Sequence, residues 1–194
     1  MEIGATKAVQ DRLKTTKIEE SKGASLVFCW DTHLTKIKGR NVLFIVNASN
    51  RYTIAMTDIE PRNWNYYTMY IRSVIHGVMQ EMGYSEDQIG QYFKMSGDTT
   101  VTKTHGRKSV GGINRMVMDA QYFGKKLEKE AKYQWELSEY LNRDICQPEG
   151  FDAYGYPSEL FKLDMERLGI ISKRKPAKII DFTQYIDTNR STNH

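Results

Sequence analysis

Cysteine is scarce in this sequence of 194 residues, and it contains no long apolar run. The two cysteines, Cys29 and Cys146, are far apart and show no metal-ligand spacing, which argues against a disulfide scaffold and against a zinc motif. No run approaches the roughly 18 apolar residues that a membrane-spanning helix needs. The opening residues, MEIGATKAVQ, lack the basic segment and apolar run of a secretory signal. We therefore expect a cytoplasmic protein that enters no membrane and holds neither a metal nor a cofactor.

The overall composition is that of a folded domain with a mildly basic balance. Hydrophobic residues make up 40% and charged residues 27%, which is too apolar for a disordered chain. The formal net charge is +4. This charge permits a nucleic acid or another polyanion as partner without requiring one, because most proteins this basic bind no nucleic acid.

Strand patterns dominate the first sixty residues. The segment SLVFCWDTHLTKI places Leu26, Phe28 and Trp30 on one face, and NVLFIVNAS is a continuous apolar run typical of a strand covered on both sides. RYTIAMTDI alternates again, and the separators contain Gly, Asn and Ser, which suit hairpin turns. These three segments predict an antiparallel meander. MEIGAT and DTTVTKT are two further strand candidates.

Two long helices are predicted after the meander. Pro61 suits a first helical turn. The following apolar residues recur at steps of three and four and predict a helix over 62–82: Trp64, Tyr67, Ile71, Val74, Ile75, Val78 and Met82. Ser85 and Gln88 have capping-box spacing, so a shorter helix begins there. The second long helix is expected to begin at Ser109, with apolar positions at Ile113, Met116, Val117, Ala120, Phe123 and Leu127.

The character of the chain changes at Gly124, where the apolar stripe gives way to mostly charged residues that keep helical spacing. We predict an α+β fold, with a small, mainly antiparallel sheet packed by two long helices and a helical C-terminal extension. The predicted division is a core domain at 1–124, a charged helical extension at 125–171, and a basic linker and tail at 172–194. The extension is expected to contribute more to partner contact than to the stability of the core.

Several features of the first part of the chain occur in a characteristic order. Thr6 and Lys7 precede the short helical segment AVQDRL, Trp30 leads into a strand pair, and SVGGIN at 109–114 follows a long helix. In this order and spacing, residues 1–120 resemble a bacterial and archaeal family catalogued as domain of unknown function 6933. The resemblance supports the fold and implies no activity. His105 and Lys108 replace an asparagine-rich approach to the serine, so no role of that loop is carried over.

The stretch KTHGRKSVGGINR, residues 103–115, is the most distinctive in the chain. It is not a P-loop, because arginine stands at the lysine position and Val101 where the first glycine belongs. Ser109 is expected to cap the following helix and leave its first-turn amides free beside two cations. We predict an anion or nucleic-acid contact site made of Lys103, His105, Arg107, Lys108 and Ser109. A capped helix start with solvated charges remains the alternative.

Tyrosines and a basic tail are the candidates for contact with a partner. Tyr66 and Tyr70 fall off the main apolar stripe of their helix, which favours exposure. Lys173, Arg174 and Lys175 form a basic cluster ahead of an amphipathic turn, a pattern typical of docking peptides and of frayed or packed termini alike.

These features favour a non-enzymatic binding or regulatory protein of a bacterium or mobile element. Its basic surface would contact a protein or nucleoprotein partner, and an inhibitor of a host nucleic-acid machine belongs to this class. The alternative is a metal-independent, ribonuclease-like phosphodiesterase that uses His33 or His105 together with Arg107 and Lys108. That alternative requires the histidines to share one cleft.

Overall fold

The computed structural model describes residues 1–15 and 18–172. The predicted contacts at Lys173, Arg174 and Lys175 therefore lie outside the described residues. No helix in the described part of the chain is long and apolar enough to cross a membrane.

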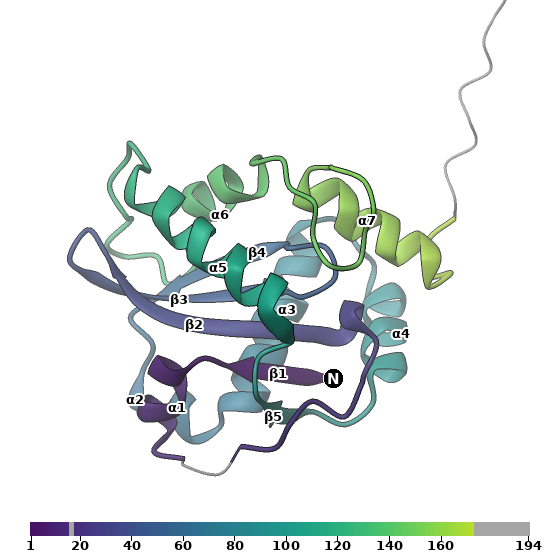
Figure 1. Cartoon of the computed structure of the whole chain (residues 1–194), viewed down its shortest axis with the longest axis horizontal. Coiled ribbons are helices and arrows are strands. Elements are labelled where there is room, and N and C mark those ends of the chain that lie inside the picture. The colour runs from purple at the N-terminus through teal and green to yellow at the C-terminus, as the bar shows by residue number, and fades with distance from the viewer. Residues whose placement is uncertain (16–17, 173–194) are drawn as a thin grey trace, which may run out of the picture.

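One mixed sheet of five strands, in the order β4-β3-β2-β1-β5, organises the α+β fold (Figure 1). The meander β2-β3-β4 is antiparallel, as predicted. The prediction of a mainly antiparallel sheet is nevertheless wrong, because β1 pairs in parallel with both β2 and β5. The strands are β1 Glu2–Ala5, β2 Cys29–Ile37, β3 Arg40–Asn47, β4 Thr53–Thr57 and β5 Thr100–Thr102.

Seven α-helices accompany the sheet within the described residues. The helix expected over 62–82 is divided at Tyr66, whose φ of −116° and ψ of 41° interrupt the helical backbone. The capping box at Ser85 and Gln88 is confirmed. The helices are α1 Lys7–Leu13, α2 Pro61–Asn65, α3 Tyr67–Glu81, α4 Glu86–Ser96, α5 Gly106–Gln121, α6 Trp135–Asn142 and α7 Pro157–Arg167.

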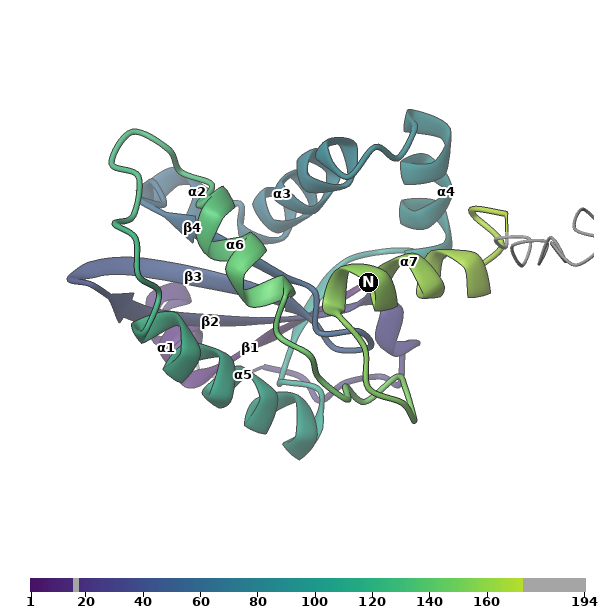
Figure 2. The same cartoon turned by 90° about the horizontal axis from the view of Figure 1, so that it is seen from above.

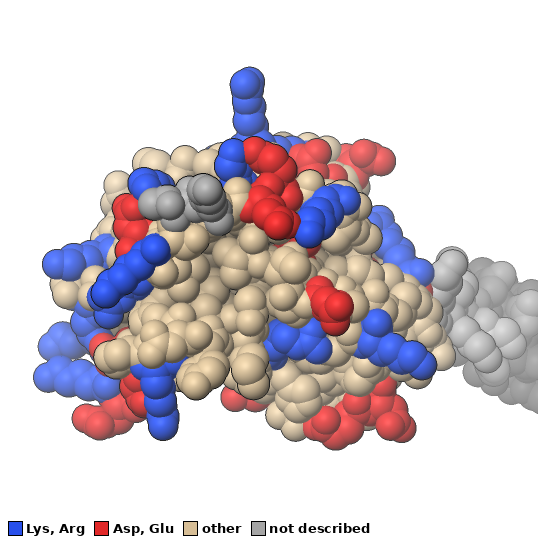
Figure 3. Space-filling view, turned by 90° about the horizontal axis from the view of Figure 1, so that it is seen from below, with Lys and Arg blue, Asp and Glu red and all other residues tan. Residues whose placement is uncertain are grey.

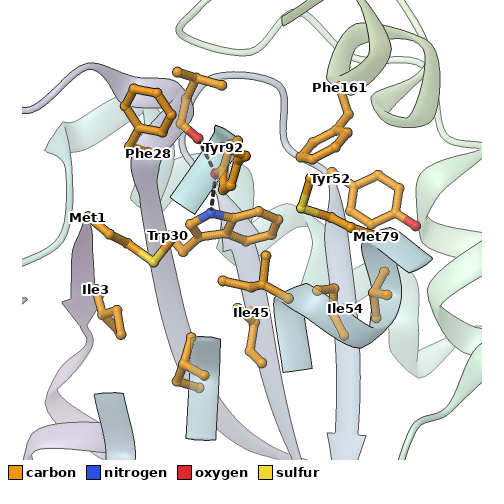
Figure 4. Packing of buried hydrophobic residues seen from close by; sticks show 14 of the residues in the cluster. Met1, Ile3, Phe28, Trp30, Ile45, Tyr52, Ile54, Met79, Tyr92 and Phe161 are labelled. Carbon is orange, nitrogen blue, oxygen red and sulfur yellow. Dashed lines mark hydrogen bonds between the residues drawn. The ribbon is translucent and has the colours of Figure 1, made fainter. Parts of the chain in front are cut away.

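The helices cover both faces of the sheet, with α3 on one face and α5 on the other (Figure 2). On the α3 face the core is built around Trp30, whose indole N–H donates to the Tyr92 hydroxyl at 2.9 Å (Figure 4). The Tyr92 hydroxyl in turn donates to the Val27 carbonyl at 2.7 Å. Both polar atoms of these buried aromatic side chains thus have partners, so their burial leaves no unsatisfied group.

The α5 face has its own apolar core, which extends past residue 124. Leu127, Leu137 and Leu141 pack with Phe44 and Met116 in one buried cluster. On the α3 face, the later helix α7 likewise contributes Phe161 and Met165 to the core. Residues before and after Gly124 therefore share the same two apolar cores, although the composition of the chain changes at Gly124.

Helix α6 also closes the β4 edge of the sheet (Figure 1). The buried side chains of Ser138 and Asn142 accept hydrogen bonds from the outward N–H groups of Ala55, at 3.0 Å, and Thr53, at 2.8 Å. The Gln134 N–H donates to the Ala55 carbonyl at 2.9 Å. An open strand edge is thereby converted into a satisfied internal surface.

The chain between α5 and α6 is irregular, which corrects the prediction that a helix continues beyond Gly124. Helix α5 ends at Gln121 and the next helix begins at Trp135. The intervening segment is held by tertiary contacts instead. The Gln134 side-chain amide donates to the carbonyls of Glu128, at 2.9 Å, and Ala131, at 2.6 Å.

Candidate functional site

Polar side chains collect on the α5 face of the sheet, at the start of α5. Strand alternation places Ile3 and Trp30 in the apolar core of the α3 face, so their neighbours point to the opposite face. The parallel register sets Glu2 beside Cys29 and Gly4 beside Asp31. We call the buried residues Glu2, Cys29, Asp31 and His105, together with the partly buried Ser109, the buried polar cluster.

Asp31 is the centre of this cluster and is fully buried. Its Oδ1 lies 2.7 Å from His105 Nδ1, and its two oxygens accept from the His105 backbone N–H at 3.2 and 3.3 Å. The Ser109 hydroxyl donates to its Oδ2. The carboxylate therefore lies at the N-terminus of α5, where the helix dipole favours a negative charge.

Glu2 holds the other side of the His105 ring. Its Oε2 lies 3.0 Å from His105 Nε2, and its Oε1 accepts from the Lys22 backbone N–H at 2.8 Å. Burial would raise the pKa of Glu2, but hydrogen bonds from Ser21, Lys22 and His105 outweigh burial and hold that pKa below its ordinary value.

His105 is the cation of the cluster when no other ion is bound. Burial alone would lower its pKa, but the hydrogen bonds and negative charge of its neighbours, Asp31 foremost, raise the pKa to about 10. At neutral pH the ring is therefore an imidazolium held between two carboxylates.

Gly4 is required for this arrangement. A Cβ atom at position 4 would lie 1.9 Å from Asp31 Oδ1 and 3.0 Å from the Thr104 Cα. The position is occupied by glycine because the Asp31 carboxylate fills the space of a side chain.

Metal-ligating atoms also converge here. One donor atom each of Glu2, Cys29 and His105 lies within 4.8 Å of the others, and all three residues are buried. Sequence spacing could not reveal this set, because its members stand at positions 2, 29 and 105 and meet only through the sheet register and the turn after β5.

The predicted contact site in residues 103–109 is divided by the structure. The prediction that Ser109 caps the helix is wrong, since α5 begins at Gly106 and Ser109 lies inside its first turns. His105 is buried, and both of its ring nitrogens face carboxylates of the chain. Lys103 pairs with Glu20. The anion expected at this helix N-terminus is thus supplied internally, by Asp31.

Arg107 and Lys108 remain on the surface. Arg107 is exposed and has no hydrogen bond or ion pair with any described residue. Lys108 is exposed, and its Nζ donates to the Pro148 carbonyl at 3.2 Å. Of the five predicted residues, these two keep charge available to an outside partner.

The outward side of α5 continues from Arg107 along one stripe of the helix. Its exposed members recur at steps of three and four, and none of them is acidic. We call this set the α5 stripe: Arg107, Gly111, Asn114, Arg115, Met118 and Tyr122. Met118 is 63% exposed and Tyr122 is 78% exposed.

His33 and His105, which the enzymatic alternative would use, have different hydrogen-bond partners. His33 Nδ1 lies 3.3 Å from Thr6 Oγ1, and burial lowers the pKa of His33. His105 is engaged by Asp31 and Glu2, and Ser109 donates to Asp31 rather than to a histidine. Neither a free base at position 105 nor an activated serine nucleophile follows from this geometry.

The two tyrosines predicted for partner contact differ in exposure. Tyr66 is 67% exposed and lines a shallow pocket with Met69, which is 68% exposed. Tyr70 is partly buried, and its hydroxyl has no hydrogen-bond partner among the described residues. Burial raises the pKa of Tyr70 to about 12.

A groove of about 630 Å³ lies between the end of α5 and α6. Aromatic, acidic and basic side chains line it, and none of the predicted site residues is among them. Trp135, Tyr140, Asp119 and Glu139 are among its lining residues.

A family model described as Domain of unknown function (DUF6933) matches residues 2–160, and the chain belongs to this family. The resemblance seen over residues 1–120 is thereby confirmed and extended across α6 into α7. A search of curated proteins and one of solved structures each find no match.

Proposed function

We propose that this family member is a cytoplasmic, non-enzymatic binding protein that contacts an anionic protein or nucleoprotein partner through the α5 stripe. The observation that carries the proposal is the composition of that stripe. Two arginines that form no ion pair with any described residue, Arg107 and Arg115, share this stripe with exposed Met118 and Tyr122. The one acidic residue of α5, Asp119, is partly buried beside the stripe.

Arginine, methionine and tyrosine are the residue types enriched where proteins meet partners. The large side chain of Tyr122 exposes apolar surface to water and does not pack into either core of the protein. The arginines supply bidentate donors for phosphate or carboxylate groups. A partner that offers both an anionic rim and a flat apolar or aromatic surface complements this stripe.

Basic side chains do not form a patch on every side of the molecule. On the face seen from below, Lys and Arg side chains are interspersed with Asp and Glu side chains and form no single basic patch (Figure 3). The proposal therefore narrows the predicted basic surface to one helix.

A double substitution tests the stripe without touching the core. Arg107→Ala with Arg115→Ala should leave the free energy of unfolding within about 0.5 kcal/mol of wild type, since both side chains are exposed. Tagged wild type and variant are compared by affinity purification from host cells, with and without nuclease. A matched control replaces Arg62 and Lys94, exposed cations on α2 and α4, with alanine.

The expected result is loss of the partner in the stripe variant and its retention in the control. If the partner is a nucleic acid, affinity for a short mixed-sequence duplex should fall, and the salt dependence of log K should become shallower by about two. If nuclease leaves recovery unchanged, the partner surface is protein. Equal recovery by wild type and stripe variant would refute the proposal.

A further inference from the structure

The buried polar cluster brings together three different kinds of metal-ligating atom. A carboxylate oxygen of Glu2, the thiol sulfur of Cys29 and a ring nitrogen of His105 lie within 4.8 Å of one another. Each comes from a different part of the fold: β1, β2 and the turn after β5. We propose that Glu2, Cys29 and His105 form a zinc site in this protein.

The donor set selects the metal. Zn²⁺ is bound in proteins by thiolate, imidazole and carboxylate groups, whereas Mg²⁺ and Ca²⁺ take oxygen ligands. Ligand atoms around a tetrahedral Zn²⁺ lie roughly 3–4 Å apart, given bonds of about 2.0 Å to nitrogen and about 2.3 Å to sulfur. The 3.0 Å between Glu2 Oε2 and His105 Nε2 is close to that spacing. Three protein ligands leave a fourth position for water.

Asp31 orients the histidine for this task. It accepts from His105 Nδ1 at 2.7 Å, which turns Nε2 toward Glu2. Metal-bound histidines characteristically donate their other ring N–H to a carboxylate, which fixes the tautomer and strengthens the ligand. The Ser109 hydroxyl and the His105 backbone N–H donate to Asp31 in turn, so the carboxylate that orients the histidine is itself held in position.

Charge compensation favours a divalent cation at this position. Zn²⁺ is bound by thiolate sulfur and neutral imidazole nitrogen, so any protons on these two ligand atoms leave to solvent as the ion enters. The ion then lies among three anionic groups, the Cys29 thiolate and the carboxylates of Glu2 and Asp31, which compensate its charge in the buried site.

Residues 22–25, which precede β2, cover the side of the site that the sheet and α5 leave uncovered. The Lys22 N–H donates to Glu2 Oε1 at 2.8 Å, and Cys29 Sγ lies 3.7 Å from the Ala24 carbonyl and 3.5 Å from that of Ser25. An ion held beneath this segment ties β1, β2 and the turn after β5 together, so its binding energy adds to the stability of the fold.

Cobalt substitution tests the site through a signal that only a thiolate ligand produces. Purified full-length protein, stripped with a chelator, is titrated with Co²⁺ and then with Zn²⁺. The expected result is one equivalent of Co²⁺ with a near-ultraviolet thiolate charge-transfer band that Zn²⁺ abolishes. Cys29→Ser should remove the band, and Cys146→Ser, a change at the other buried cysteine, should keep it.

Two further measurements distinguish the three metal ligands from Asp31, which only orients one of them. Asp31→Asn should keep the charge-transfer band and weaken affinity by about 10–100-fold, because the ligands remain but lose their orientation. Zn²⁺, and not Mg²⁺, should raise the melting temperature of the wild type. Absence of the band in the wild type would refute the zinc site even if every variant failed to fold. A band that survives Cys29→Ser would also refute it.

Discussion

Trp30 and Asp31 are neighbours on β2 that face opposite sides of the sheet. Trp30 is 1% exposed and Asp31 is fully buried, so the two are equally removed from water. Trp30 is surrounded by side chains that fill space, whereas Asp31 is held by donors from His105 and Ser109 at defined positions. An apolar core accepts many combinations of apolar side chains of suitable total volume, but a buried charge requires particular hydrogen-bonding partners.

The most severe change removes packing from both faces at once. Truncation after Gly124 deletes Leu137 and Leu141 from the α5 face and Phe161 from the α3 face, and it bares the β4 edge. We expect the truncated chain to lose cooperative unfolding in urea, monitored by near-ultraviolet circular dichroism. A single cooperative transition would instead support an independent core domain at 1–124, as composition predicts.

On the polar face, Asp31→Ala should be the most damaging single substitution. It leaves the His105 imidazolium buried beside only one carboxylate, and removing one partner of a buried pair costs about 3–5 kcal/mol. Urea unfolding of metal-free protein measures the loss. Asp11→Ala, at an exposed ion pair with Lys7, is the control and should cost at most about 1 kcal/mol. Equal effects of the two changes would show that the cluster carries no special stability.

On the apolar face, Ile75→Ala should lower the free energy of unfolding by about 2–5 kcal/mol. Ile75 is fully buried on α3 and packs in the Trp30 core, so truncation leaves a cavity. Ser73→Ala, at an exposed position of the same helix, should stay within about 0.5 kcal/mol of wild type. A loss below that limit for Ile75→Ala would contradict the packing of α3 on the sheet.

The smallest effect is expected at the sheet edge. Ser138→Ala removes the acceptor of the Ala55 N–H, and an unsatisfied buried donor costs about 1–3 kcal/mol. Glu136→Ala, a partly exposed neighbour on α6, is the control and should cost at most about 1 kcal/mol. If both variants unfold at the same urea concentration as wild type, the α6 side chains do not stabilise β4.

Local patterns were sufficient for much of the secondary structure. The alternation around Trp30, the continuous apolar run of β3 and the capping box at Ser85 each depend on residues within one segment. The prediction of a helix beyond Gly124 failed for the converse reason. Helical spacing of charged residues is compatible with a helix, but the backbone there bonds to Gln134 instead.

The start of α5 shows how tertiary contacts override a capping signal. Ser109 precedes an apolar run and satisfies the usual rule, yet the helix starts three residues earlier, at Gly106. Gly106 adopts a positive φ of 91°, and Asp31 engages the backbone N–H of His105 from the neighbouring sheet. No residue near Ser109 in the sequence indicates that the Asp31 carboxylate would bind at this helix start.

The sequence by itself determined the α+β class, the meander, the capped start of α4 and the family resemblance, because periodicity and capping act over a few residues. Tertiary structure alone decided that β1 lies parallel between β2 and β5, and that residues 2, 29, 31 and 105 share one buried cluster. It also decided that α6 closes the sheet edge. These features depend on pairings between distant segments, and a pairing is set by the free energy of the whole fold rather than by either segment alone.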